Sequence, residues 1–230
     1  MILECNQLTK RFGGFTALNE VNLSLESNQI IGLLGPNGSG KSTLIKLING
    51  ILVPDSGTIR INQMTPGVET KKIISYLPER NSLPVWMKIQ DLIKMYDEFF
   101  EDFDPEKAKE MLQRLKIDAA KRVKTLSKGN REKVQLVLAM SRKSKLYCLD
   151  EPIGGVDPAS RDFILNTILG NYREDSTILI STHLIQDVEN ILDTVVFIKE
   201  GNVHTCAQAE ALREEYHESI DSIFREVFKC

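Results

Sequence analysis

The chain has 230 residues, of which 29 are lysine or arginine and 32 are aspartate or glutamate, so its formal net charge is −3. This balance argues against electrostatic binding to nucleic acid or to an anionic membrane surface. Every apolar run is shorter than the about 18 residues that span a bilayer, and the first residues lack the basic and apolar regions of a signal peptide. We therefore expect a cytosolic protein with one large domain or two small ones.

The first strands are expected at residues 2–8 and 21–25, where apolar and polar side chains alternate as in half-exposed antiparallel strands. A turn with two glycines, residues 11–14, lies between them and contains Phe12. Phe12 has two interpretations: core packing, which is the commoner role of an aromatic side chain, or stacking on a base.

A glycine-rich loop lies between the apolar run 30–34 and the amphipathic run 44–51, so it is predicted to connect a strand to a helix. Its residues match the pattern G-x-x-x-x-G-K-S/T: Gly35, Pro36, Asn37, Gly38, Ser39, Gly40, Lys41, Ser42 and Thr43. In such a phosphate loop, backbone N–H groups and the helix N-terminus surround phosphate oxygens. Lys41 is predicted to reach the β- and γ-phosphates, and the hydroxyl of Ser42 to bind Mg²⁺. A chance glycine turn would not need every fixed position and both flanking elements.

Two further strands are predicted at 58–62 and 73–77, and a short loop containing Glu79 follows the second. A carboxylate just past a strand end is well placed for a metal site in an open α/β sheet. The alternative is a solvated loop charge, which is the more common situation.

Residues 88–143 have apolar side chains at helical spacing and almost no strand pattern. This predicts a helical arm inserted into the α/β domain. Within it, Ser127 is a candidate N-cap with Gly129 beside it. Such a sequence is typical of an ordinary capped helix start, and it can also form a backbone nest for an anion.

An apolar strand is predicted at 145–150, and it ends in two carboxylates, Asp150 and Glu151. Charges at the carboxyl end of such a strand point into the crevice where open α/β sheets bind ligands. Adjacent acids are costly to hold there without a cation or a proton-transfer role. Asp150 is therefore predicted to hold Mg²⁺, and Glu151 to orient and deprotonate an attacking water. The alternative is an acid pair in solvent.

Two candidates follow, Asp157 and His183. Asp157 precedes a proline at a helix start, where an N-cap is its structural interpretation. His183 ends the strand predicted at 176–182, on the edge that holds Asp150, and we favour a contact with a γ-phosphate over a purely structural role. A last strand is expected at 194–199, and one helical stripe from residue 207 onward is expected to pack on its own domain.

Together these residues resemble the ATP-binding subunit of an ABC transporter, and the resemblance covers essentially the whole chain. The similar motifs are the Walker A loop at 35–43, Walker B at 146–150, the catalytic glutamate at Glu151, the signature at 126–130, the D-loop at 154–157 and the switch histidine at His183. Phe12 stands where the family usually has an adenine-stacking tyrosine. The resemblance therefore favours stacking on a base over core packing for Phe12.

The resemblance implies an α/β fold with a P-loop NTPase core and a mixed sheet, an N-terminal antiparallel β subdomain and an inserted helical subdomain. The chain would be a single domain, with the core at 1–83 and 144–230 and the helical subdomain at 84–143. ATP and Mg²⁺ would be the cofactors. The implied site comprises nucleotide contacts from Phe12, the loop 35–43, Ser127, Gly129 and Asp157, metal ligands Ser42, Glu79 and Asp150, and catalytic residues Lys41, Glu151 and His183.

The resemblance also implies that two such domains, identical or different, close head to tail with ATP between one subunit's phosphate loop and the other's Ser127 and Gly129. Hydrolysis would drive a separate integral membrane permease, which would hold the protein on the cytoplasmic face of the cell membrane. No nucleic-acid partner is expected. The alternatives are an ABC ATPase that drives protein assembly, and a nucleotide sensor, which the intact Glu151 and His183 disfavour.

Three positions depart from the family pattern. Glu79 replaces the usual glutamine, Lys128 and Asn130 replace the first glycine and the glutamine of the signature, and Phe12 lacks the tyrosine hydroxyl. The sequences around Glu79 and Ser127 resemble the exporter-type group whose permeases belong to the ABC-2 class. In this family the permease supplies the substrate path, so these residues do not identify the transported substance.

Overall fold

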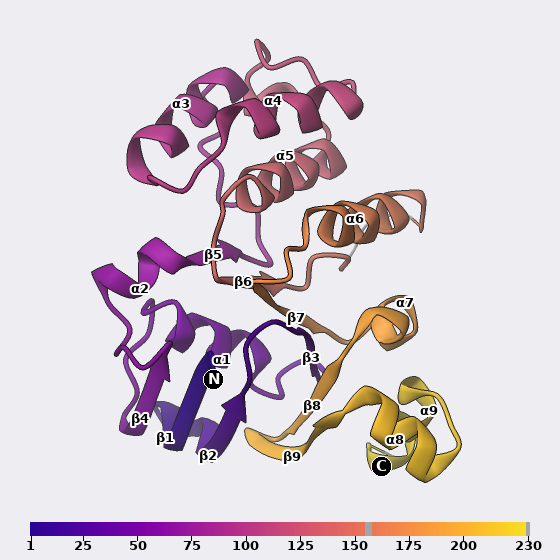
Figure 1. Ribbon diagram of the computed structural model, residues 1–230. Helices are drawn as coiled ribbons and strands as arrows, with labels where there is room; N and C mark the ends of the chain where they lie inside the picture. Colours follow the sequence, from indigo (N-terminus) through magenta and orange to yellow (C-terminus); the bar gives the residue numbers. More distant parts are fainter. Residues whose placement is uncertain (155–157, 229–230) are drawn as a thin grey trace.

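Two β-sheets form the base of the molecule in the computed structural model, which describes residues 1–154 and 158–228 (Figure 1). The first is antiparallel, with the order β2-β1-β4. The second has the order β5-β6-β7-β3-β8-β9 and is parallel except for the antiparallel pair β8-β9. The strands are β1 (Leu3–Phe12), β2 (Phe15–Leu25), β3 (Ile30–Leu34), β4 (Ser56–Ile61), β5 (Ile74–Leu77), β6 (Leu146–Asp150), β7 (Thr177–Thr182), β8 (Thr194–Lys199) and β9 (Asn202–Gln208).

The helices lie on both sides of the mixed sheet, and three of them form a separate layer beyond β5 and β6 (Figure 1). That layer consists of α3 (Ile89–Phe99), α4 (Pro105–Arg114) and α5 (Lys128–Met140). The other helices are α1 (Lys41–Ile48), α2 (Val68–Ile73), α6 (Pro158–Asn171), α7 (Ile185–Val188), α8 (Ala209–Tyr216) and α9 (Ile220–Val227). The layer is the expected inserted helical arm, whereas its boundaries at 84 and 143 stay a prediction. No described helix combines the length and the apolar character needed to cross a membrane.

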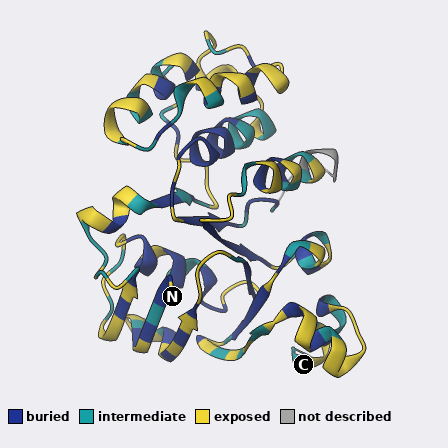
Figure 2. Ribbon diagram, in the orientation of Figure 1, coloured by how far each residue is buried: buried dark blue, intermediate teal, exposed yellow. Residues whose placement is uncertain are grey.

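The central strands of the mixed sheet are buried on both faces, as their colour in Figure 2 shows. Every residue of β3, β6 and β7 is buried. One apolar cluster fills the space between this sheet, α1 and the antiparallel sheet, and a second lies on the opposite face beneath the helical layer. Helices therefore cover a sheet whose strands read as continuous apolar runs, which is the pattern of parallel sheets. The strands predicted at these positions are confirmed.

The structure differs from the sequence predictions in two places. Helix α2 was not expected. The prediction of a single helical stripe from residue 207 is wrong, because the chain first forms β9, which pairs with β8, and then two short helices. His217 adopts a left-handed conformation with φ 54° and ends α8, after which the side chain of Ser219 caps α9. The stripe does pack on its own domain: the ring centroid of Phe224 lies 5.5 Å from that of Phe197 in β8.

A buried arginine joins the helical layer to the core. Arg142 follows α5 and is 3% exposed. Its Nε donates to Asp102 Oδ1 at 2.8 Å, and its guanidinium stacks 4.0 Å from the ring of Phe100, between α3 and α4. The same guanidinium donates to the carbonyls of Lys72 and Ile74, where α2 meets β5. One side chain therefore links the helical layer to the junction of α2 and β5 in the core.

We expect Arg142→Met to lower the free energy of unfolding by about 3 kcal/mol, because the partners of a buried guanidinium lose their donor. Urea denaturation measures this loss. The matched control is Arg114→Met, which breaks an exposed pair with Glu110 and should cost at most about 1 kcal/mol. Equal losses in the two variants would contradict the role assigned to Arg142.

Candidate active site

The phosphate loop needs glycine for steric reasons. Gly38 and Gly40 have φ values of 81° and 110°, which side chains of L-residues rarely adopt. A Cβ atom on Gly40 would also lie 2.6 Å from the carbonyl oxygen of Ala17. Helix α1 begins at Lys41, and no side chain caps its N-terminus. The first N–H groups of this helix are therefore available to an anion.

Lys41 is buried at the base of this loop and is 4% exposed. Its Nζ donates to the carbonyls of Gly35 at 2.7 Å and Pro36 at 3.1 Å, and lies 3.5 Å from Glu151 Oε1. Burial lowers the pKa of Lys41, and the nearby carboxylate of Glu151 opposes that effect. The ammonium group thus lies between the loop backbone and an acid.

Asp150 is held by two hydroxyl groups from different elements. It is 1% exposed, and its Oδ1 accepts from Ser42 Oγ at 3.0 Å and from Ser181 Oγ at 2.6 Å. Burial raises the pKa of Asp150; these two hydrogen bonds oppose the rise, and the negative charges of Glu79 and Glu151 add to it. Ser181 was missed from the sequence, although a serine in an apolar strand two residues before His183 was a usable signal.

Glu151 lies between Lys41 and His183. It has a left-handed conformation with φ 50°, and its N–H donates to the carbonyl of Ser181 at 3.0 Å. His183 Nδ1 lies 3.0 Å from Glu151 Oε2. The carboxylate is 9% exposed and the imidazole 40% exposed. This arrangement connects a buried ammonium, a carboxylate and a histidine at the carboxyl edge of the mixed sheet.

A cavity of about 330 Å³ lies beside the loop and extends to the tip of the first hairpin. Phe12 and Phe15, which pair across the hairpin, line it together with Thr43, Glu79 and Glu151. Phe12 is 48% exposed, so the interpretation of Phe12 as core packing is wrong. Phe15 was missed, although it stands directly after the two-glycine turn that drew attention to Phe12.

The predicted signature residues lie away from this cavity. Ser127 is the exposed N-cap of α5, and its Oγ accepts from the N–H of Asn130 at 3.3 Å. A Cβ on Gly129 would meet no atom within 4 Å. Neither residue lines the cavities beside Lys41 and Glu151. Asp157 lies outside the described residues.

Several groups of the site fit a nucleoside triphosphate with a divalent cation. Ser39 Oγ is buried and has no hydrogen-bond partner among the described residues, which suits a place beside phosphate oxygens. Nowhere in the described chain do three or more His, Cys, Asp or Glu side chains gather so as to hold a metal by themselves. Mg²⁺ commonly takes one or two carboxylates and completes its coordination with phosphate oxygens and water, for which Asp150 and Ser42 are placed.

A strand, glycine loop and helix, with a buried aspartate at the end of the next strand but one in the sheet, define a P-loop nucleoside triphosphatase. The family described as ABC transporter matches residues 18–154. Among curated relatives, the ABC transporter ATP-binding protein YtrB of Bacillus subtilis is 33% identical over 94% of this chain and 75% of its own length. The Nod factor export ATP-binding protein I of Rhizobium sp. is 28% identical over 90% of this chain and 71% of its own length.

Solved structures agree with this match. An ATP-binding subunit of an ABC transporter superposes with a TM-score of 0.89 and 26% identity, and the alignment covers both chains completely. A nucleotide-free ATP-binding cassette from an ABC transporter gives a TM-score of 0.76 at 25% identity, covering 94% of this chain and 95% of the other. The chain belongs to the ATP-binding proteins of the ABC transporter family, and it is an ATPase that binds ATP. The predicted fold class is confirmed.

The buried carboxylate predicts a pH-dependent stability effect. Because the pKa of Asp150 is raised in the folded protein, the charged form costs stability at high pH, and this cost disappears as the pH falls through the raised pKa. We expect Asp150→Asn to raise the free energy of unfolding of the nucleotide-free protein by about 1 kcal/mol at pH 8. The gain should shrink as the pH is lowered.

Urea denaturation at several pH values between 5 and 8 measures this difference. Asp97→Asn is the control, since this aspartate is exposed and its replacement should leave the stability unchanged at each pH. A gain that does not vary with pH, or a loss at pH 8, would contradict the electrostatic explanation.

Proposed function

We propose that this ATPase drives a separate integral membrane permease of an exporter, and that two ATP-binding subunits close head to tail around ATP. The observation that carries the proposal is the position of Glu151 between Lys41 and His183 at the end of β6. The direction of transport is supported by the name of one relative, which refers to Nod factor export, and by the exporter-type residues around Glu79.

In this proposal the loop 35–43 surrounds the phosphates of ATP, with Lys41 on the β- and γ-phosphates. Phe12 stacks on the adenine from the hairpin side of the cavity. Ser42, Asp150 and Glu79 would hold Mg²⁺, which when bound would neutralise charge on the phosphates. Asp150 keeps its place through Ser181, so strand β7 orients the metal ligand.

Glu151 acts as the general base in this mechanism. Its carboxylate accepts a proton from the attacking water, while Lys41 leaves its contact with Glu151 to stabilise the phosphate charge. His183 donates to the γ-phosphate from the other side of Glu151. The three side chains would thus exchange contacts with one another for contacts with the nucleotide.

In this proposal a second subunit completes the nucleotide site, because the signature residues lie away from the cavity beside Lys41. Ser127 and Gly129 are at the open end of α5 and do not line the cavity beside Lys41, so they can reach a nucleotide bound to another copy or to a different ATP-binding chain. Asp157 is assigned to the same contact. Closure of the pair would exclude water and position the nucleophile.

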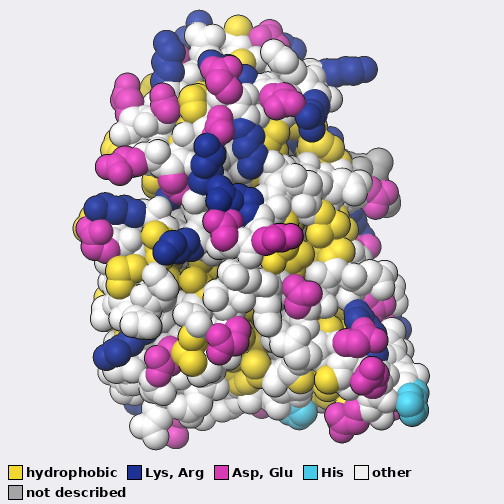
Figure 3. Space-filling view, in the orientation of Figure 1, with side chains coloured by type: hydrophobic (Ala, Val, Ile, Leu, Met, Phe, Trp, Pro, Cys, Tyr) yellow, Lys and Arg dark blue, Asp and Glu magenta, His cyan; other side chains and the backbone are white. Residues whose placement is uncertain are grey.

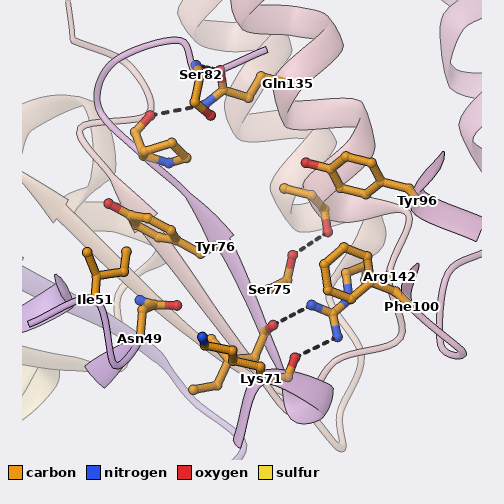
Figure 4. A pocket seen from close by; sticks show the side chains of 13 residues that line it. Asn49, Ile51, Lys71, Ser75, Tyr76, Ser82, Tyr96, Phe100, Gln135 and Arg142 are labelled. Atoms are coloured by element: carbon orange, nitrogen blue, oxygen red, sulfur yellow. Dashed lines mark hydrogen bonds between the residues drawn. The ribbon is translucent and has the colours of Figure 1, made fainter. Parts of the chain in front are cut away.

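The permease is proposed to dock in the groove between the core and the helical layer. A cavity of about 520 Å³ lies there, lined from the core by Ile51 and Tyr76 and from the helical layer by Tyr96 (Figure 4). Trp86, at the edge of the helical layer, is 66% exposed and adds apolar surface. Docking would hold the protein at the cytoplasmic face of the membrane. Basic and acidic side chains are interspersed on the face seen in Figure 3, which does not favour a nucleic-acid partner.

We expect Glu151→Gln to lower the ATPase rate at least about 100-fold, the scale of a lost general base, while ATP binding is kept. Phosphate release and equilibrium nucleotide binding measure the two quantities. The control is Glu132→Gln, a carboxylate that lines the neighbouring cavity without contacting Lys41 or His183. Near-normal hydrolysis by Glu151→Gln, or an equal loss in the control, would contradict the role of Glu151.

The permease is tested by affinity capture of tagged Glu151→Gln protein from detergent-solubilised native cells in the presence of Mg·ATP. We expect a partner with several apolar spans of about 20 residues. Adding Ile51→Asp in the groove should abolish the capture, whereas Val53→Asp, which is more exposed and does not line the groove, should not. Only soluble partners, from a preparation in which other membrane complexes survive, would favour an assembly ATPase.

A further inference from the structure

A buried glutamine in α5 contacts the loop that carries Glu79. Gln135 is 5% exposed, although the neighbouring buried positions of this helix are apolar. Its Nε2 donates to the carbonyl of Pro78 at 3.2 Å, and its Oε1 accepts from the N–H of Ser82 at 3.2 Å (Figure 4). One side-chain amide therefore contacts both ends of the loop 78–82.

This loop has few other attachments. Asn81 Oδ1 accepts from the N–H of Leu83, which is a contact within the same segment. Among the residues that the structure describes, the hydrogen bond from the N–H of Ser82 to Gln135 is the one that connects residues 79–82 to another element. The position of Glu79 relative to the nucleotide cavity therefore depends on this amide.

The chemistry of Gln135 also argues for more than packing. A buried amide is costly unless its polar atoms are paired, and an apolar side chain of similar length would fill the same volume without that cost. Gln135 lines the groove of Figure 4 and also the small cavity that contains Asp150 and Glu151. It lies between the surface proposed for the permease and the site of hydrolysis.

We infer that Gln135 is a positioning residue, which holds Glu79 at the nucleotide site by fixing the loop 78–82 to α5. A movement of the helical layer would then move Glu79 together with Ser127, since both are attached to the same helix. The inference rests on the proposed role of Glu79 as a ligand of Mg²⁺.

The test compares Gln135→Met with Ser75→Ala. Methionine keeps the length of the side chain and removes both hydrogen bonds. Ser75 is also buried and its Oγ donates to the carbonyl of Ala139 at 2.8 Å, so Ser75→Ala removes a hydrogen bond between β5 and α5 without touching the loop.

We expect Gln135→Met to lower kcat at least about tenfold and to raise the Mg²⁺ concentration for half-maximal activity, as misplacement of a ligand does. ATP binding measured without Mg²⁺ should be unchanged. Ser75→Ala should match the unmodified protein in all three measurements. Equal kinetic effects in Gln135→Met and Ser75→Ala would indicate a general packing role and would overturn the inference.

Two further measurements separate the possible failures. Amide hydrogen exchange of a peptide spanning residues 79–82 should be faster in Gln135→Met and unchanged in Ser75→Ala, and unchanged exchange in both would overturn the inference. In a Glu79→Ala background, Gln135→Met should cause no additional loss of kcat, and an additional loss of kcat would also overturn the inference.

The two possible failures are distinguishable. If Glu79→Ala alone has no effect while Glu151→Gln is inactive, the inference fails and the proposed ATPase mechanism stands. If Glu151→Gln stays active, that mechanism fails, whereas exchange and Mg²⁺ dependence still decide the role of Gln135.

Discussion

Burial of the Asp150 carboxylate is the constraint on which the rest of the site depends. A carboxylate that is 1% exposed needs donors or a cation, and here Ser42 at the start of α1 and Ser181 at the end of β7 supply the donors. Three elements are thereby joined at one oxygen atom. Glu79 and Glu151 add negative charge to the same region, and Lys41 lies beside Glu151. The protein thus holds an excess of acid where a cation and phosphates would bind, at a cost in stability.

Arg142 and Gln135 join the helical layer to the core in chemically different ways. Arg142 uses a charged guanidinium on a carboxylate and on backbone carbonyls, and such charge-assisted hydrogen bonds are the stronger kind. Gln135 uses two neutral hydrogen bonds of 3.2 Å. The stronger contacts of Arg142 suit an attachment that persists when the helical layer moves. The weaker contacts of Gln135 suit an attachment through which α5 moves the loop 78–82. Arg142 and Gln135 lie at opposite ends of the groove shown in Figure 4.

The parts of the site that were predictable are those that depend on neighbours in sequence. The phosphate loop, the acid pair at the end of β6 and His183 after β7 stand where apolar strands end, so burial and turn chemistry indicate their places. The residues that were missed act across the fold. Ser181 meets Asp150 from 31 residues away, and Gln135 meets Pro78 from 57 residues away, so neither contact leaves a local pattern.

By itself the sequence determined the class of protein, the places of most of its strands and the phosphate loop, because apolar runs, glycine conformations and motif spacing act over a few residues. Only the tertiary structure decided that β9 pairs with β8, that Phe15 shares a cavity with Phe12, and that α5 is fastened to the loop carrying Glu79. The physical reason is strand pairing and packing between distant segments. The parallel register of β6 and β7 places Asp150 opposite Ser181, and a shift by one residue would move every side chain to the other face.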